Sequence, residues 1–189
     1  MIDFINRPFK GAELLPVERF KLFHWVLEKK PYNILEIGTG KGGATYYMAE
    51  AIKEIGKGHI ITCDPHRKPD LKLFKEFPFI EYYKMKSDVV IQDVIDRGIE
   101  IDFIFFDGPE DPKVALRNIK QLEKWITTGT LFSMHDWETE ERIHDNGIST
   151  KAKLIRPYIE KSKRWRKIEV LDGLESSDTV GLCFYQYKR

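Results

Sequence analysis

A glycine-rich turn between a short apolar strand and a helix is the feature that most constrains the fold of this chain. Residues 33–43 read Asn-Ile-Leu-Glu-Ile-Gly-Thr-Gly-Lys-Gly-Gly. Glycine adopts positive φ angles and lacks a Cβ, so the backbone can approach a ligand closely, and the first turn of the following helix offers free N–H groups. The run therefore predicts a nucleotide-type cofactor site at the end of a strand.

Two interpretations fit the spacing of these glycines. Gly38, Gly40 and Gly43 satisfy the Gly-x-Gly-x-x-Gly pattern of dinucleotide sites. Glu36 precedes them and completes a second pattern, Glu-x-Gly-x-Gly-x-Gly, which ends at Gly42. Because the two patterns imply different chemistry, the rest of the chain has to decide between them.

Size and composition favour one globular domain over residues 1–189. A helical cover at 1–30 would precede a core at 31–189, and 189 residues leave little room for a second core. Apolar residues make up 42%, charged residues 32%, and the net charge is +1, which argues against disorder and against general affinity for nucleic acid. Without a membrane-length apolar run or a signal-peptide pattern, we expect a cytoplasmic protein with no membrane partner. Cys63 and Cys183 are expected to be buried small hydrophobic residues.

Hydrophobic periodicity predicts strands alternating with helices. The expected strands span 33–37, 59–63, 79–84, 101–106 and 130–134, and the helices 13–29, 44–55, 66–77, 89–96 and 112–126. The apolar run 101–106 is typical of a parallel strand covered on both faces. A basic helix at 151–163 and an antiparallel strand pair at 165–171 and 179–187 complete the pattern. Exposed Phe or Trp on the broadly apolar first helix would favour a homodimer.

Polar residues follow four of these strands, at ends that a parallel sheet brings to one edge. They are Glu36 and Gly38, then Asp64, then Asp107, then His135 and Asp136. Asp64 stands where a carboxylate can accept both ribose hydroxyls of NAD or of S-adenosylmethionine (SAM). Glu36 suits the cationic methionine end of SAM, and the chain is short for a dehydrogenase with a substrate domain. These points, with the terminal strand pair, favour SAM.

The order of motifs resembles that of the class I SAM-dependent methyltransferases over roughly residues 30–187. The resemblance implies an α/β, Rossmann-like fold with a seven-stranded, mostly parallel sheet, its last strand antiparallel, and helices on both faces. It also implies a set of cofactor-binding residues. These are Glu36, Gly38, Thr39, Gly40 and Gly42 around the methionine, Asp64 at the ribose, Asp88 beside the adenine, and Asp107.

Residues 101–108 and 129–137 resemble more narrowly the small-molecule O-methyltransferases that include the catechol and macrolide or aminocoumarin sugar enzymes. In those relatives, acids after the fourth and fifth strands hold a divalent metal, commonly magnesium, which orients a substrate hydroxyl. The resemblance gives these positions to Asp107 and Asp136. It implies methyl transfer to the oxygen of a small-molecule acceptor.

The chain departs from that pattern at two places. His135 or Trp137, depending on the alignment, replaces a neighbouring acid or amide, and a histidine ligand weakens the case for magnesium or favours a softer metal. The position of the family's catalytic residue falls on Pro109 or Glu110, and proline cannot transfer a proton. A metal-free enzyme with His135 as general base beside Asp107 is therefore the competing hypothesis.

Other interpretations remain open for several features. Asp64 can cap the next helix, and Asp107 can be a turn acid before Gly-Pro. The polar segment 137–150 is the best candidate for a lid. The basic stretch from Lys151 to Lys167 is typical of a solvated helix face, with nucleic-acid binding the less favoured interpretation. An NAD-linked oxidoreductase and a noncatalytic adenosyl-cofactor-binding protein are the alternative functions.

Overall fold

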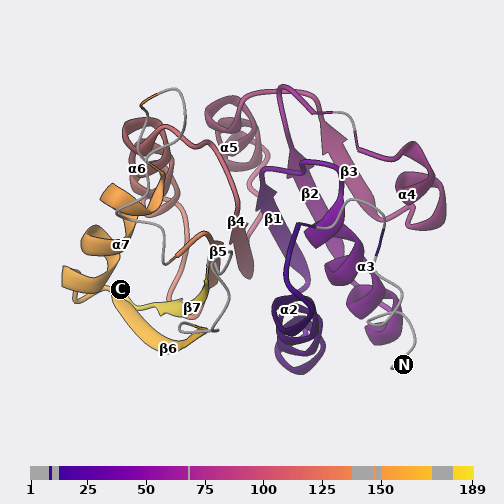
Figure 1. Ribbon diagram of the computed structural model, residues 1–189, viewed down its shortest axis with the longest axis horizontal. Coiled ribbons are helices and arrows are strands. Elements are labelled where there is room, and N and C mark those ends of the chain that lie inside the picture. The colour runs from indigo at the N-terminus through magenta and orange to yellow at the C-terminus, as the bar shows by residue number, and fades with distance from the viewer. Residues whose placement is uncertain (1–8, 10–12, 68, 138–146, 148–149, 172–180) are drawn as a thin grey trace.

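A seven-stranded sheet runs through the molecule, with helices packed on both faces (Figure 1). The computed structural model describes residues 9, 13–67, 69–137, 147, 150–171 and 181–189. The strands are β1 (Asn33–Ile37), β2 (His59–Cys63), β3 (Ile80–Tyr83), β4 (Phe103–Phe106), β5 (Leu131–His135), β6 (Trp165–Leu171) and β7 (Leu182–Tyr187). Their order is β3-β2-β1-β4-β5-β7-β6, and β7 runs antiparallel to both of its neighbours. The predicted fold class is confirmed.

The helices form two layers that cover opposite faces of the sheet. They are α2 (Pro16–Lys29), α3 (Gly43–Ile55), α4 (Leu71–Glu76), α5 (Ser87–Asp96), α6 (Pro112–Leu122) and α7 (Ala152–Lys161). Strand β4 contacts both layers, because Phe103 and Phe105 pack with α2 and α3 whereas Ile104 and Phe106 pack with α5, α6 and α7. This double burial explains the continuous apolar run of the strand.

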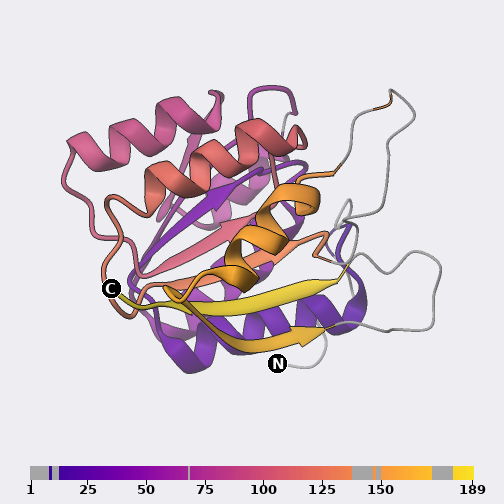
Figure 2. The ribbon, with the colours of Figure 1, turned by 90° about the vertical axis from the view of Figure 1, so that its left-hand side faces the viewer.

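The chain order places the carboxyl ends of the parallel strands at one edge. From β1 the chain moves outward to β3 and then returns to β4 on the other side of β1. Figure 2 shows the parallel strands directed to the edge from which the chain enters α6, with β7 running the opposite way. In open α/β sheets ligands bind at this edge, where the strand order reverses.

Several predicted boundaries differ from the structure, most clearly at α4. The predicted helix 66–77 is wrong at its start, because residues 66, 67, 69 and 70 are not helical and α4 begins at Leu71. Asp64 Oδ1 accepts hydrogen bonds from the backbone N–H groups of His66 and Arg67, and Asp70 caps the helix that begins at Leu71. These local acceptors hold the backbone in turns and delay the helix.

The first helix, α2, buries part of its apolar set and leaves part exposed. Trp25 packs against Phe103 and Phe184, whereas Val17 and Phe20 are exposed. Residues 1–8 and 10–12 of the helical cover, and most of the predicted lid (138–146, 148 and 149), lie outside the described residues.

Two further expectations concern the cysteines and the membrane. Cys63 and Cys183 are both buried, as predicted. None of the helices within the described residues has the length and apolar character needed to cross a membrane.

Candidate active site

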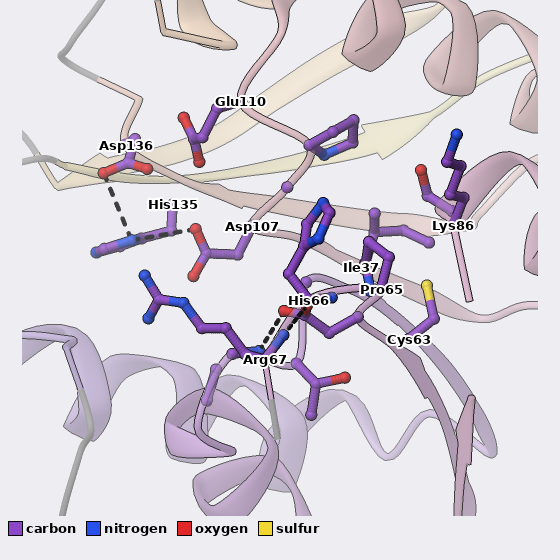
Figure 3. A pocket seen from close by; sticks show the side chains of 18 of the residues that line it. Ile37, Cys63, Pro65, His66, Arg67, Lys86, Asp107, Glu110, His135 and Asp136 are labelled. Carbon is purple, nitrogen blue, oxygen red and sulfur yellow. Dashed lines mark hydrogen bonds and ion pairs between the residues drawn. The ribbon is translucent and has the colours of Figure 1, made fainter. Parts of the chain in front are cut away.

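A cavity of about 610 Å³ lies at the carboxyl ends of β1, β2, β4 and β5 (Figure 3). This volume falls within the range of small-molecule and cofactor sites. The cavity wall contains most of the predicted site residues, namely Gly38, Thr39, Gly40, Asp64, Asp88, Asp107, His135 and Asp136. Glu36 and Gly42 are not among the described residues that line the cavity.

The glycine turn, residues 38–43, is fixed against the ends of β2 and β4. The backbone N–H groups of Gly38 and Thr39 donate to the Cys63 carbonyl over 2.9 and 3.1 Å. Gly38 has a φ of +97°, and a Cβ there would lie 2.4 Å from the carbonyl oxygen of Asp107. A side chain at this position would therefore push β1 and β4 apart.

Glu36 is fully buried beside the glycine turn. The hydroxyls of Thr45 and Thr62 donate to its Oε2 over 2.6 and 2.5 Å, and Thr39 in the turn bonds to Thr62. Its Oε1 has no hydrogen-bond partner among the described residues. Burial raises the pKa of the Glu36 carboxyl to about 7, although the threonine hydroxyls act in the opposite direction. Glu36 thus has an acceptor that a cationic group can satisfy.

Asp64 both shapes the turn after β2 and lines the cavity. Its Oδ2 accepts the N–H of Gly40 over 2.9 Å, and its Oδ1 accepts the N–H groups of His66 and Arg67, each over 2.8 Å. The expectation that Asp64 caps the next helix is wrong, because Asp70 caps α4, and Asp64 instead links the glycine turn to the loop after β2.

Asp88 lies at the far side of the cavity, in the first turn of α5. It is half-buried, and its Oδ2 lies 3.7 Å from the guanidinium of Arg117. The neighbouring Ser87 is buried and hydrogen-bonded to Asn118 on α6. This part of the wall is held more loosely than the glycine turn.

A buried lysine joins three carboxylates on the opposite wall. Lys151 Nζ lies 3.3 Å from Asp107 Oδ1 and 3.0 Å from Glu110 Oε1, and it also contacts Asp136 Oδ2. Its side chain is 0% exposed. The prediction that Lys151 belongs to a solvated basic face is wrong, because the residue precedes α7 at the carboxyl edge of the sheet. We call the group Asp107, Glu110, His135, Asp136 and Lys151, with Glu18, the charge cluster.

His135 is held among carboxylates from three segments. Its Nδ1 lies 3.4 Å from Asp107 Oδ1 and 3.6 Å from Asp136 Oδ1, and its Nε2 lies 3.3 Å from Glu18 Oε2. In Figure 3 the His135 ring lies between Asp107 and Asp136. Burial opposes the charge, but the surrounding carboxylates raise the pKa of His135 well above its ordinary value. The surrounding carboxylates thus favour the imidazolium form of the ring, which has no lone pair to accept a proton.

Asp107 is the ionised centre of the charge cluster. Burial alone would raise the pKa of its carboxyl, but the charges of His135 and Lys151 lower it to about 2. Its side chain remains 28% exposed toward the cavity. Figure 3 also shows Arg67 extending toward Asp107 and His135 from the side of β2.

Sequence patterns missed two residues of this cluster. Glu18 lies on α2, more than a hundred residues from His135, and nothing in the local sequence marks it as a site residue. Lys151 was visible only as one of many basic residues. Asp136, which the sequence did predict as a site residue, has a φ of +61°. Residues other than glycine seldom adopt such an angle.

The predicted metal ligands come together, but a lysine shares them. Ligand atoms of Asp107, His135 and Asp136 lie within 4.8 Å of one another. The Lys151 ammonium contacts both of these aspartates. While it does so, the donor set does not fit a divalent cation, which would stand beside a buried positive charge.

A comparison with protein families matches the segment that carries this site. A family model described as a methyltransferase domain covers residues 35–137, more than half of the chain. The match runs from β1 to the residue after Asp136. It includes the glycine turn, Asp64, Asp107 and His135.

Solved structures share the fold at low sequence identity. The O-methyltransferase from Bacillus cereus, in complex with SAH, has a TM-score of 0.72 at 20% identity, covering 94% of this chain and 84% of that chain. The O-methyltransferase TomG from Streptomyces achromogenes, involved in tomaymycin synthesis and solved with SAM, has a TM-score of 0.73 at 13% identity, with coverages of 93% and 82%. At these identities the likeness shows the fold.

A curated relative shows a shorter but more identical match. Ribosomal RNA large subunit methyltransferase E of Methanosphaera stadtmanae is 33% identical over 85 residues. The match covers 45% of this chain and 36% of the relative, so it spans about a third of that protein's length.

Proposed function

Because the chain belongs to the methyltransferase domain family, we propose that it uses SAM to methylate a small-molecule acceptor at oxygen. The observation that carries the proposal is one cavity with the glycine turn and Asp64 on one side and the charge cluster on the other. Bound SAM supplies a methyl group on a positively charged sulfonium. The two walls correspond to a cofactor side and an acceptor side.

The cofactor side fits SAM through its buried and turn-bound groups. Glu36 has a buried oxygen without a partner, which suits the ammonium of the methionine portion reached directly or through water. Asp64 lies at the end of β2, where a carboxylate can accept ribose hydroxyls. Because Gly38 has no side chain, the glycine turn can lie directly against the end of β4.

The charge of the wall supports SAM over NAD. Seven carboxylate residues line the cavity, against four lysine or arginine residues and His135, whose carboxylate neighbours favour its charged form. The carboxylates are Glu13, Asp64, Asp88, Asp107, Glu110, Asp111 and Asp136, and the basic residues are Lys41, Arg67, Lys86 and Arg117. An acidic wall attracts a sulfonium and repels the pyrophosphate of a dinucleotide.

On the acceptor side, Asp107 is placed to orient the nucleophile. Its ionised carboxylate can accept the hydrogen of an acceptor hydroxyl, which aims the oxygen lone pair at the methyl carbon. In-line attack would form the oxygen–carbon bond as the carbon–sulfur bond breaks, with SAH as the leaving group, and the proton of the methylated oxygen would pass to the Asp107 carboxylate and then to solvent. Such alignment can supply ~7 to 11 kcal/mol in favourable cases. His135, held as an imidazolium, fixes Asp107 and does not serve as the base in this arrangement.

A small molecule is favoured over RNA by the position of the basic stretch. Most of its exposed members lie at the end of α7 and the start of β6, opposite the carboxyl edge (Figure 2), whereas Lys153 lies in the first turn of α7; the former are Lys161, Lys163, Arg164, Arg166 and Lys167. No basic residue from 151–167 belongs to the described cavity wall. The match to a ribosomal RNA methyltransferase nevertheless makes RNA methylation the second candidate.

Cofactor binding and methyl transfer test these proposals separately. Calorimetry of the full chain with SAM, with its demethylated product SAH and with NAD should give heat for the first two only. Labelled SAM should then transfer its methyl group to members of a hydroxylated small-molecule panel and not to ribosomal RNA. Tight NAD binding with no response to SAM or SAH would support an oxidoreductase, and cofactor binding without transfer to any acceptor would support a noncatalytic protein.

Three further proposals concern domain organisation, location and oligomeric state. We propose a single catalytic domain, a cytoplasmic location, and a homodimer contact on α2 at Val17 and Phe20, the exposed members of its apolar set. Sedimentation of the Phe20→Glu variant tests the contact, since a dimer through this face should become a monomer.

A further inference from the structure

The Lys151 ammonium is saturated by carboxylates. A protonated lysine has three N–H donors and no acceptor. Three carboxylates receive them, from Asp107 at 3.3 Å, Glu110 at 3.0 Å and Asp136. With a side chain that is 0% exposed, Lys151 has neither a free donor nor an open route to solvent.

The three carboxylates differ from the lysine in their access to the cavity. Their side chains are 28%, 44% and 20% exposed for Asp107, Glu110 and Asp136. All three line the cavity, whereas Lys151 does not. Lys151 therefore supports the wall from behind and cannot touch an acceptor in this arrangement.

A divalent cation on the same oxygens would have to displace the ammonium. Metal–oxygen bonds of about 2.0–2.6 Å would bring the ion into the space between the carboxylates that the ammonium now bridges. The buried lysine would then lose its three acceptors and lie beside a second positive charge. Each of these changes is unfavourable in a poorly solvated site.

We propose that Lys151 takes the place of a divalent cation in this site and that methyl transfer, on the function proposed above, needs no metal. Lys151 is a positioning residue. It neutralises part of the charge of Asp107, Glu110 and Asp136 and fixes their spacing, so that the cavity-facing oxygens of Asp107 and Glu110 are held ready for the acceptor. The lysine is supplied by the segment before α7, and the carboxylates follow β4 and β5.

Manganese binding by the full chain tests the proposal without reference to activity. The electron paramagnetic resonance signal of free Mn²⁺ should remain unchanged when wild-type protein is added. Lys151→Met removes the ammonium that the three carboxylates share, while His135 stays beside Asp107 and Asp136. The variant should bind one Mn²⁺ at least about tenfold more tightly than wild type. The matched control Lys161→Met, an exposed lysine on α7, should behave as wild type.

The opposite results are equally definite. Stoichiometric Mn²⁺ binding by the wild type that is lost in Asp136→Asn would overturn the proposal. So would a folded Lys151→Met that gains no Mn²⁺ affinity. If Lys151→Met does not fold, Lys151→Arg replaces it. The retained cation should keep Mn²⁺ out as in wild type, and stoichiometric Mn²⁺ binding by Lys151→Arg would overturn the proposal.

Calorimetry with SAH separates this proposal from the function on which it rests. Wild-type protein that excludes Mn²⁺ but fails to bind SAH would contradict the proposed function alone. Wild-type protein that binds SAH and requires Mn²⁺ for transfer would contradict the role of Lys151 alone.

Discussion

The glycine turn and the charge cluster face one cavity but are built in different ways. The glycine turn comes from six consecutive residues and is fixed largely by backbone hydrogen bonds to the ends of neighbouring strands. The charge cluster collects side chains from α2, from the ends of β4 and β5, and from the segment before α7. One wall is therefore a local structure, and the other exists only after the whole sheet has formed.

This difference predicts how the two walls respond to mutation. A change in the charge cluster should act first on stability, because buried charges lose their partners. A change in the glycine turn should act on both stability and cofactor affinity, because the backbone itself forms the binding surface. Variants of the two walls can therefore be told apart by measuring both quantities.

The largest effect is expected for Lys151→Met. Breaking a buried ion pair by removing one partner costs about 3–5 kcal/mol, and here three carboxylates lose the same cation. Urea denaturation should show this loss, while SAH affinity of the folded fraction changes by less than about threefold. Lys161→Met, the exposed control, should stay within about 0.5 kcal/mol of wild type. A loss of SAH binding in a stably folded Lys151→Met would mean that the two walls are coupled.

Gly38→Ala is expected to have the next largest effect. Its methyl group would lie 2.4 Å from the Asp107 carbonyl oxygen at a φ of +97°, which should cost about 2–4 kcal/mol. SAH affinity should fall together with stability, as calorimetry on the folded variant can show.

Gly56→Ala is the matched control for the backbone angle. Gly56 has a φ of +80° at the end of α3, and a Cβ there would meet nothing within 4 Å. Its cost should be about 1–2 kcal/mol from the left-handed backbone alone. Equal losses in the two alanine variants would show that the contact between Gly38 and Asp107 contributes nothing.

The contrast between the walls also explains what the sequence could predict. The glycine turn was predictable because Glu36 and the glycines lie close together in the sequence. The strands around it, β1, β2 and β4, are also marked by short apolar runs. The sheet order followed from the resemblance, and the burial of β4 from the run 101–106. The end of β2 was harder, since Asp64 forms side-chain-capped turns that resemble the start of a helix.

The charge cluster could be predicted only in part. Asp107, His135 and Asp136 were visible because parallel strands bring their ends to one edge. Glu18 and Lys151 were not, because a helix residue and a loop residue far away in sequence reach the same place only through tertiary packing. The protonation of His135 depends on the carboxylates of Asp107, Asp136 and Glu18, and nothing in the sequence indicated Glu18.

Glu36→Gln should produce a smaller effect whose sign depends on pH. The folded-state pKa of Glu36 is raised from 4.5 to about 7, so the folded protein binds the proton more tightly than the unfolded chain. Wild-type stability should therefore fall as pH rises from about 4.5 through 7, by roughly 2–3 kcal/mol for this group. Glutamine lacks this ionisation, so the variant should be more stable than wild type above pH 7.

The same substitution should weaken SAM binding. The neutral amide cannot pair with an ammonium as a carboxylate does, and a loss of about tenfold corresponds to one charge-assisted hydrogen bond. Denaturation at pH 5 and pH 8 together with calorimetry checks both effects. Glu54→Gln, on the exposed side of α3, is the control and should change neither quantity. If Glu36→Gln raises stability but leaves SAM affinity unchanged, Glu36 does not belong to the cofactor site, and an NAD-linked protein is favoured.

The smallest effect is expected for Asp88→Ala, at the loosely held end of the cavity. Its ion pair with Arg117 is long, 3.7 Å, and both side chains are largely exposed, so its loss should cost no more than about 0.5 kcal/mol. A carboxylate beside adenine would accept a hydrogen bond from the exocyclic amino group, and its removal should weaken SAH binding by about fivefold. Arg117→Gln breaks the same ion pair without removing that acceptor. If Arg117→Gln weakens SAH binding as much as Asp88→Ala does, the ion pair and not a contact with adenine accounts for the effect. If only Asp88→Ala weakens SAH binding, the cofactor wall extends from the glycine turn to α5.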